Sequence, residues 1–431
     1  LTRLFIPICL ETLFYMLSGM VDTLMLSAVG DYAVGAVGTA NSYIGIFIIM
    51  FSIISSGMVS VMTQNIGAGR PGVAYQARQL GLLFNAVAGV LMAVFLFSGA
   101  GAILRMVGIA DALYEPALIY LKIVGGGCIL NAVIPIFSSY LRAFGYTKQP
   151  LYATIVGNIA NFVMNAVFLF VLHKGVAGVA AATVISKILN LCIVLYFSHK
   201  LISAKNSTER IANKTVLGQI VKVGLPSACE TALYNVAMML VIRFLNQMDA
   251  EGLNVTARSY TATISNFSYC VGAALAQANA IMTGWHIGAG ELEECDRGTK
   301  RAAFVGVCVA VCMETAIVLG SGFIMPLFTD NPEMTALVRK LLAIDIVLEI
   351  GRVTNLVFGQ ALKTSGDAVF PAVIAAVFMF VFAVGGTWLF GISMGLMAVG
   401  AYIGLASDEC VRAVGMVWRW KTGKWRTKKL V

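Results

Sequence analysis

The sequence has few charged residues, and this scarcity restricts the class of protein that it can encode. Asp, Glu, Lys and Arg make up 12% of the 431 residues, whereas 59% are hydrophobic. A soluble domain contains about 25% charged residues. The composition therefore excludes a soluble globular protein and indicates an integral membrane protein. Histidine is scarce too: only three occur, far apart in sequence, and none is given a role.

Cysteine is present but follows no pattern that would indicate chemistry. The nine cysteines are scattered through apolar stretches, without a C-x-x-C pair or an accompanying histidine cluster. Structural thiols are therefore expected in place of a metal or redox site. We expect no metal, no cofactor and no catalytic residues. The protein is therefore not expected to be an enzyme.

Long apolar runs are what the sequence has in abundance. About 20 helical residues cross the roughly 30 Å of hydrocarbon in a bilayer, and runs of this length recur along the whole chain. Their length excludes the roughly ten-residue alternating strands of an outer-membrane barrel. We predict twelve spans, with approximate bounds at 4–28, 35–64, 75–103, 113–141, 150–172, 176–198, 216–246, 257–286, 301–325, 336–362, 370–390 and 395–418.

The Lys and Arg residues are divided unevenly between the two sides of the predicted membrane. With the N-terminus placed inside, twenty of the thirty lie on that side and six on the opposite side. This is the positive-inside asymmetry, and it predicts a multi-pass protein of the cell (inner) membrane with both termini in the cytoplasm. It also accounts for the net charge of +9 without nucleic acid as a partner.

The basic tail at residues 419–431 follows the last span and contains tryptophan as well as Lys and Arg. Together with Trp418, the tryptophans Trp420 and Trp425 give this end the composition of an interfacial anchor on an anionic leaflet. A signal that orients the chain in the membrane is sufficient to account for the same composition.

An internal repeat is the most informative feature of the sequence. The stretch "PICLETLFY" from residue 7 returns as "PSACETALY" 219 residues later, which makes Glu11 equivalent to Glu230 and Tyr15 equivalent to Tyr234. "IGAGR" returns as "IGAGE", and "LRAFGYTKQP" as "LKTSGDAVFP", both after 221 residues. The shared order and near-constant offset indicate duplication. "IGAG" lacks the strand that a phosphate-binding loop requires, and we interpret it as a tight turn that ends a helix.

Each half contains six spans, an even number, so both halves enter the membrane from the same side as parallel repeats. The predicted fold is all-α and integral to the membrane, with twelve transmembrane helices in two six-helix bundles around a central cleft. Many secondary transporters achieve alternating access with two such bundles, although a channel or receptor could also be duplicated. The predicted parts are an N-lobe at 1–198, a cytoplasmic inter-lobe loop at 199–215, a C-lobe at 216–418 and the tail at 419–431.

Several motifs follow one another in a fixed order: "VDTLMLSAVG", "QNIGAGR", "LRAFGYTKQP", "NIANFVMN" and "GVAGVAAAT", and in the second half "SDECVRAVGMVWRWKTGKW". As a set, covering essentially the whole chain, they resemble the multidrug and toxic compound extrusion (MATE) family, in a bacterial form. The resemblance implies twelve helices in two lobes, and export of organic, often cationic, compounds in exchange for H+ or Na+. It implies no ATP hydrolysis, in agreement with the absence of a G-x-x-x-x-G-K-[ST] motif.

One face of the first span carries polar groups. Glu11, Tyr15, Ser18 and Asp22 are spaced 4, 3 and 4 residues apart, which places them on one side of a helix. The two acids are roughly 16 Å apart along the axis, too far to share a proton. We therefore treat Asp22 as a functional acid, because an ionisable group at membrane depth marks a pathway or relay by default.

Three amides lie on one face of the fifth span. Asn158, Asn161 and Asn165 are spaced 3 and 4 residues apart, and they can hold the Asp22 carboxylate if their face meets it. The resemblance places Asp22, Asn161, Asn165 and Thr183 at the cation-linked positions of the family's N-lobe. Some members have an aspartate where this chain has Asn165, so a sodium site is weakened here; H+ is the favoured coupling ion and Na+ remains possible.

The second half provides an internal control. By the repeat, Asp22 corresponds to Val241 and Asn161 to Phe382, so the C-lobe lacks this polar set. It has other charges in helical i,i+3 and i,i+4 positions, which predict ion pairs: Glu349 with Arg352, and Asp408 with Arg412. A structural role and a substrate role stay open for them, and capping or gating is as plausible as substrate contact for Glu11 and Glu230. The remaining substrate or gating candidates are Tyr15, Ser18 and Tyr234.

The favoured function is that of a secondary active antiporter that exports organic, amphipathic, cationic compounds by alternating access of two lobes. The expected partners are small organic substrates and membrane lipids, and we expect a monomer. One alternative is a flippase for a lipid-linked precursor, which would need a strongly basic cavity. An uncoupled channel or receptor is the other.

Overall fold

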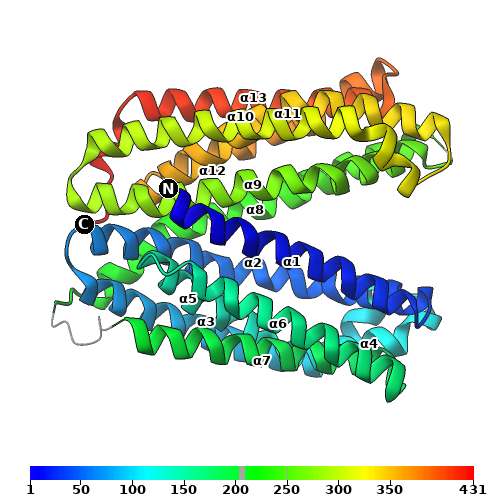
Figure 1. Cartoon of the computed structure of the whole chain (residues 1–431), viewed down its shortest axis with the longest axis horizontal. Coiled ribbons are helices and arrows are strands. Elements are labelled where there is room, and N and C mark those ends of the chain that lie inside the picture. Colours follow the sequence, from blue (N-terminus) through cyan, green and yellow to red (C-terminus); the bar gives the residue numbers. More distant parts are fainter. Residues whose placement is uncertain (203–208, 250) are drawn as a thin grey trace. The chain divides into compact units, whose positions relative to one another are not determined.

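The computed structural model describes residues 1–202, 209–249 and 251–431, and over these ranges the chain is helical with short connections (Figure 1). The described residues contain no strand, so the all-α prediction is confirmed. Residues 203–208 of the predicted inter-lobe loop lie outside the described residues.

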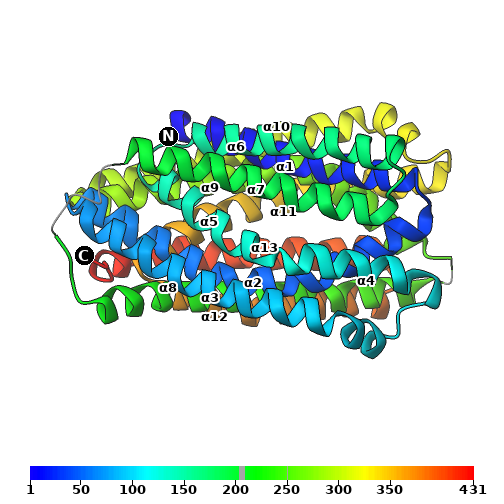
Figure 2. The same ribbon diagram turned by 90° about the horizontal axis from the view of Figure 1, so that it is seen from below.

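The first of two compact units consists of Ile6–Gly224. Its apolar core combines large side chains with small ones, among them Ala33, Ala36 and Ala40, which are fully buried; small side chains allow membrane helices to pack closely. In both views α6 and α7 lie side by side (Figure 1, Figure 2). The helices are α1 (Thr2–Ser27), α2 (Asp31–Gly67), α3 (Pro71–Val107), α4 (Asp111–Gly126), α5 (Cys128–Ala143), α6 (Lys148–Ala166) with the π-helical turn η1 (Val167–Val171), α7 (Gly175–Leu201) and the start of α8 (Asn213–Met248).

The second unit consists of Leu1–Phe5 and Leu225–Val431. In it α11 packs against both α9 and α13 and thereby occupies a central position. The helices are the rest of α8, α9 (Leu253–Ala289), α10 (Leu292–Ile324) with η3 (Met325–Leu327), α11 (Pro332–Ser365), α12 (Val369–Phe378) continued by η4 (Met379–Val384) and η5 (Thr387–Ser393), α13 (Met397–Lys421) and η6 (Lys424–Thr427).

Apolar character divides the long helices into two groups. Among the described residues, eight helices are long and apolar enough to cross a membrane, and α4 with α5 makes a ninth such span that is bent by 41°. The bend falls at Gly127, in a run of three glycines that weakens the helix. The long helices outside this group are α9, α11 and α13, the three that pack together in the second unit. Ion pairs join α11 to α13.

The turn predicted for "IGAG" is present in both repeats. Gly69 has φ 74° and Gly290 has φ 80°, a left-handed conformation that glycine adopts without the steric cost of a Cβ atom. After α2 the amide of Arg70 donates to the carbonyl of Asn65, and after α9 the amide of Glu291 donates to that of His286, both at 2.8 Å. These are the closing bonds of a helix C-cap, so the helix-ending interpretation is confirmed.

The tail differs from the interfacial anchor that its composition suggests. The rings of Trp420 and Trp425 are stacked at 4.2 Å between centroids, and each side chain is only 1% exposed. The indole of Trp420 donates to Asp296 on α10 at 2.7 Å. Of the three tryptophans only Trp418, 57% exposed, faces outward. An anchor built from all three is therefore wrong, because two of the rings are used to fasten the tail to the second unit.

The tail also closes over the end of α11, and this contact predicts a difference between two glycines. A Cβ atom on Gly366 (φ 98°) would lie 2.3 Å from the carbonyl oxygen of Lys428, whereas one on Gly395 (φ 69°) would meet nothing within 4 Å. Gly395→Ala should cost about 1–2 kcal/mol for its left-handed backbone alone, and Gly366→Ala should cost more, because the tail must also move. Thermal unfolding of the two purified variants measures the difference; equal losses would contradict it.

Candidate functional site

The two repeats contain equivalent ion pairs. Arg142 on α5 donates to the Glu11 carboxylate at 2.5 Å, with both side chains largely buried. In the other unit, the Lys363 ammonium on α11 lies 2.7 Å from the Glu230 carboxylate on α8. Lys363 follows Arg142 by 221 residues, so it is also the repeat equivalent. None of these four residues lines the cavities described below, and the geometry favours a structural role for Glu11 and Glu230.

The first unit contains a cavity of about 400 Å³ between α1, α2, α4, α5, α6 and α7. Asp22 lines it and accepts a hydrogen bond at 2.9 Å from the amide of Asn165. The same amide group lies 3.0 Å from the carbonyl oxygen of Asn161. Sequence spacing had suggested that the amide face of the fifth span could meet Asp22, and two of the three asparagines do form this chain of contacts.

The other residues predicted around Asp22 line the same cavity but bond elsewhere. The amide of Asn158 donates to the carbonyl of Phe14 on α1 at 3.0 Å, and the hydroxyl of Thr183 donates to Val179 within its own helix at 2.9 Å. Tyr15, which is 75% exposed, and Ser18 also line the cavity. Their positions place them within reach of a molecule that enters it.

Lys187 is a residue of this cavity that was not predicted as part of a site. Its ammonium donates to the side-chain carbonyl of Asn131 at 2.7 Å, and it interacts electrostatically with Asp22, although no ion pair within 4.0 Å joins the two in the described residues. Among the residues that line the cavity, Asp22 is the only acid and Lys187 the only Lys or Arg. The sequence signal that could have identified Lys187 is a basic residue inside an apolar span.

Both ion pairs predicted for the C-lobe are formed. Arg352 bonds to Glu349 one turn away on α11, and Arg412 binds Asp408 through two hydrogen bonds of 2.8 and 3.0 Å. Glu409 joins the pairs, because its carboxylate lies 2.8 Å from Arg412 and 3.7 Å from Arg352. The result is one network that links α11 to α13.

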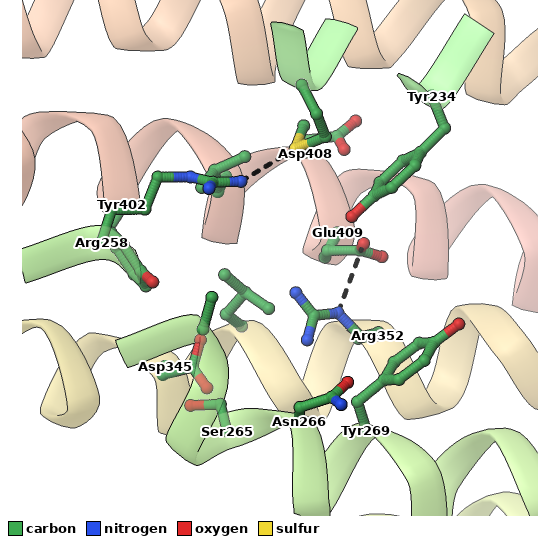
Figure 3. Close-up of a pocket in the computed structure, with 14 residues that line it drawn as sticks. Tyr234, Arg258, Ser265, Asn266, Tyr269, Asp345, Arg352, Tyr402, Asp408 and Glu409 are labelled. Carbon is green, nitrogen blue, oxygen red and sulfur yellow. Dashed lines mark hydrogen bonds and ion pairs between the residues drawn. The ribbon is translucent and has the colours of Figure 1, made fainter. Parts of the chain in front are cut away.

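A second cavity, of about 270 Å³, lies beside this network. Figure 3 shows Tyr234, Arg352 and Glu409 at one end and Arg258, Tyr402 and Asp345 at the other. The predicted residues that line it are Tyr234, Arg352 and Asp408. Glu349 and Arg412 do not line it and act through the residues that they bind.

Sequence reasoning missed three charged groups here. Glu314 on α10 is fully buried, and neither of its carboxylate oxygens has a hydrogen-bond partner of good geometry in the described residues; it interacts electrostatically with Asp345 and Glu349. Asp345 and Arg258 line the cavity. The signal available for all three was an ionisable residue inside a predicted span, and only its position relative to the other helices shows what it faces.

Comparison with known protein families gives a match over most of the chain. The family described as MatE matches residues 7–167 and, separately, residues 226–389. The two matches fall one in each repeat. The transporter YisQ of Bacillus subtilis (strain 168), described as uncharacterized, is 32% identical over 428 residues, which cover 98% of this chain and 94% of that protein.

More distant relatives agree. A protein of Thermotoga maritima described as a probable multidrug resistance protein, NorM, is 20% identical over 444 residues and covers 100% of this chain and 94% of its own length. A solved structure, the outward-facing conformation of a multidrug resistance MATE family transporter of the MOP superfamily, superposes with a TM-score of 0.85 at 20% identity, covering 98% of this chain and 95% of that one. At this identity the structural likeness establishes the fold, which has twelve transmembrane helices.

The buried ion pair between Glu11 and Arg142 predicts the outcome of a charge exchange. Glu11→Lys should destabilise the protein by about 3–5 kcal/mol, because it leaves two like charges in a largely buried position. Adding Arg142→Glu should restore most of the loss. The same exchange at Glu294 and Arg297, which are 56% and 75% exposed, should change stability by less than about 1 kcal/mol. Thermal unfolding of purified variants measures all four, and a double variant no more stable than Glu11→Lys would refute the pair.

Proposed function

The chain belongs to the MATE family of multidrug transporters, and we propose that it exports organic cations in exchange for protons, with Asp22 as the group that carries the coupling proton. Membership makes the chain a transporter and not an enzyme. It also disfavours the lipid flippase, the channel and the receptor. Antiport, the coupling ion and the cationic substrate are the proposed part.

The observation that supports this proposal is the isolation of Asp22. Among the described residues that line the N-lobe cavity it is the only acid. It is held by the amide of Asn165, and the other repeat has Val241 in its place, fully buried in an apolar core. A duplicated structural residue would be kept in both lobes, as Glu11 and Glu230 are. An acid retained in one lobe only is consistent with a task that one lobe performs.

The surroundings of Asp22 favour H+ over Na+. A sodium site needs several oxygen ligands, preferably with more than one negative charge, and here Asn165 supplies a neutral amide. Lys187 contributes a positive charge to the same cavity, which disfavours any cation beside Asp22. A proton needs only a carboxylate oxygen, whereas Na+ needs several further oxygen ligands to offset that repulsion. H+ is therefore the coupling ion that we propose, and this choice rests on charge and on the number of ligands.

The same two charges give a physical account of exchange. With Asp22 ionised, the charges of Asp22 and Lys187 cancel, so the cavity has no net charge and the carboxylate can attract a cationic substrate. Protonation of Asp22 leaves the cavity with a net positive charge from Lys187, so a bound cation is repelled. Proton entry from the outside would then drive release to that side, and loss of the proton to the inside would restore affinity for the next substrate. Alternating access supplies the two openings.

The charge content of both cavities argues against a lipid-precursor flippase as the second candidate. A phosphate-bearing substrate requires a strongly basic site. The N-lobe cavity has one acid and one lysine. Among the residues that line the C-lobe cavity, three acids, Asp345, Asp408 and Glu409, outnumber the two arginines, Arg258 and Arg352.

The decisive variant is Asp22→Asn, tested in proteoliposomes with ethidium as a fluorescent organic cation. Wild-type protein should drive H+ counterflux as ethidium moves uphill. Asp22→Asn should reduce counterflux to the level of protein-free liposomes, because the amide cannot carry the proton. Asp330→Asn, an exposed substitution of the same kind, is the matched control. Uphill export by wild type driven by a sodium gradient alone, and indifferent to a pH gradient, would overturn the choice of proton; unchanged coupled export in Asp22→Asn would remove the site.

Lys187 provides a separate test of the preference for H+. Lys187→Met removes the positive charge that opposes a metal cation, so Na+ should bind the cavity more tightly and raise the unfolding temperature of the variant as NaCl replaces choline chloride. Wild type and Lys174→Met, which changes an exposed lysine, should show no such dependence. Wild-type protein that is stabilised by Na+ as strongly as the variant would show that Lys187 does not exclude sodium.

A further inference from the structure

Arg258 is a cation of the C-lobe cavity without an acidic partner. It lies on α9, half-buried, and its guanidinium contacts the thioether sulfur of Met238 at 3.8 Å (Figure 3). Over the part of the chain that the structure describes, no carboxylate comes within 4.0 Å of it. A thioether is a weak acceptor, so this contact leaves the charge almost uncompensated. Cations at membrane depth are costly unless they are paired or serve a function.

Asp345 is the complementary case at the same end of the cavity. It lies on α11, only 2% exposed, and in the described residues no Lys or Arg nitrogen lies within 4.0 Å of its carboxylate. One oxygen, Oδ2, is buried without a hydrogen-bond partner of good geometry, although the Ser265 hydroxyl lies beside the carboxylate and Arg352 attracts it from a longer distance. Tyr402 interacts electrostatically with both Asp345 and Arg258, so the two opposite charges lie around one tyrosine without forming a pair of their own.

The remaining charges of this region are already committed. Arg352 is bound by Glu349 and faces Glu409, and Arg412 is bound by Asp408 and Glu409. These pairs are all within or between α11 and α13, whereas Arg258 comes from α9. The cavity therefore presents a network of paired charges at one end and one unpaired charge of each sign at the other.

We propose that this cavity binds a zwitterion, an aromatic compound with one ammonium group and one carboxylate. The ammonium pairs with Asp345, including its unpartnered Oδ2, and the carboxylate pairs with Arg258 in place of the thioether. Tyr234, Tyr269 and Tyr402 line the cavity and supply flat faces for the ring. This assignment deepens the proposed export function and rests on it for the direction of transport, but the binding site itself does not depend on the coupling ion.

The unpaired arginine is what separates this proposal from a site for simple cations. The acids of the cavity would attract any ammonium compound, with or without a carboxylate. A site selected for cations alone gains nothing from a guanidinium that repels them. Binding a carboxylate turns that repulsion into a charge-assisted hydrogen bond, and each such bond is worth about tenfold or more in affinity.

A series of three compounds on one ring tests the proposal by calorimetry on the full chain in detergent. The zwitterion is 4-(aminomethyl)benzoic acid, its methyl ester is a cation of the same shape, and its N-acetyl derivative is an anion. The zwitterion should bind about tenfold more tightly than either of the other two. An ester that binds as tightly as the zwitterion, or no binding of any of the three at millimolar concentration, would overturn the proposal.

Two variants should change the affinities of the three compounds in different ways. Arg258→Gln should weaken the zwitterion about tenfold and bind the ester no less tightly than wild type, because a repelling charge is removed, whereas Asp345→Asn should weaken the zwitterion about tenfold and bind the N-acetyl anion no less tightly. Arg258→Lys keeps the charge and should retain the preference for the zwitterion. The exposed substitutions Arg339→Gln and Asp330→Asn are the matched controls. If both variants weaken all three compounds equally, the two residues act through the fold and the assignment is wrong.

The outcome can be separated from that of the export experiment. Binding in detergent requires no gradient, so Asp22→Asn should abolish proton counterflux and leave the order of the three affinities unchanged. A wild-type protein that orders the compounds as expected but shows no proton exchange would refute the antiport mechanism and keep the site. Proton exchange with no preference for the zwitterion would do the reverse.

Discussion

The cost of a charge in an apolar environment is the constraint on which the second unit is built. Five buried acids lie on α10, α11 and α13, near the arginines Arg258, Arg352 and Arg412. In the described residues three of the acids and two of the arginines form one network. Each charged side chain would destabilise the fold if it were alone, since removal of one member of a pair leaves an uncompensated buried charge. The network joins α11 to α13, two of the three long helices that are too polar to pass as membrane spans. In the described residues Arg258, Asp345 and Glu314 form no ion pair with it, and of these three Arg258 and Asp345 line the cavity.

The duplicated ion pairs show what the two repeats had to keep. Glu11 with Arg142 and Glu230 with Lys363 join equivalent helices, and the turns that end α2 and α9 use equivalent glycines. These features stabilise a bundle in whichever lobe they occur. Asp22, Lys187 and the asparagine pair occur in one lobe, and the arginine-centred network in the other. The repeats therefore differ mainly in the charged and polar groups in and beside the cavities. They agree in the groups that hold the helices together.

Much of the fold was accessible from the sequence because it depends on short-range rules. Helix length follows from the thickness of the hydrocarbon layer, the helix-ending turns from glycine, and the predicted C-lobe pairs from the spacing of residues on a single helix. Each prediction of this kind concerns residues within a few positions of one another. The interpretation of the tail as an interfacial anchor was wrong for the complementary reason. Its tryptophans have the composition of an anchor, but the partners of Trp420 and Trp425 include a residue more than a hundred positions away.

The sequence by itself determined that the chain is an all-helical membrane protein of duplicated design. It also determined that Asp22 lies on a polar face of the first span and that three asparagines lie on one face of the fifth. The tertiary structure decided which of those faces meet: Asn165 bonds to Asp22 and to Asn161, Asn158 bonds to backbone, and Lys187 lines the same cavity. It also decided that Glu409 bridges two arginines while Arg258 and Asp345 stay apart. The physical reason is that helical periodicity fixes the direction of a side chain relative to its own helix, whereas the distance between two charges on different helices depends on how the whole bundle packs.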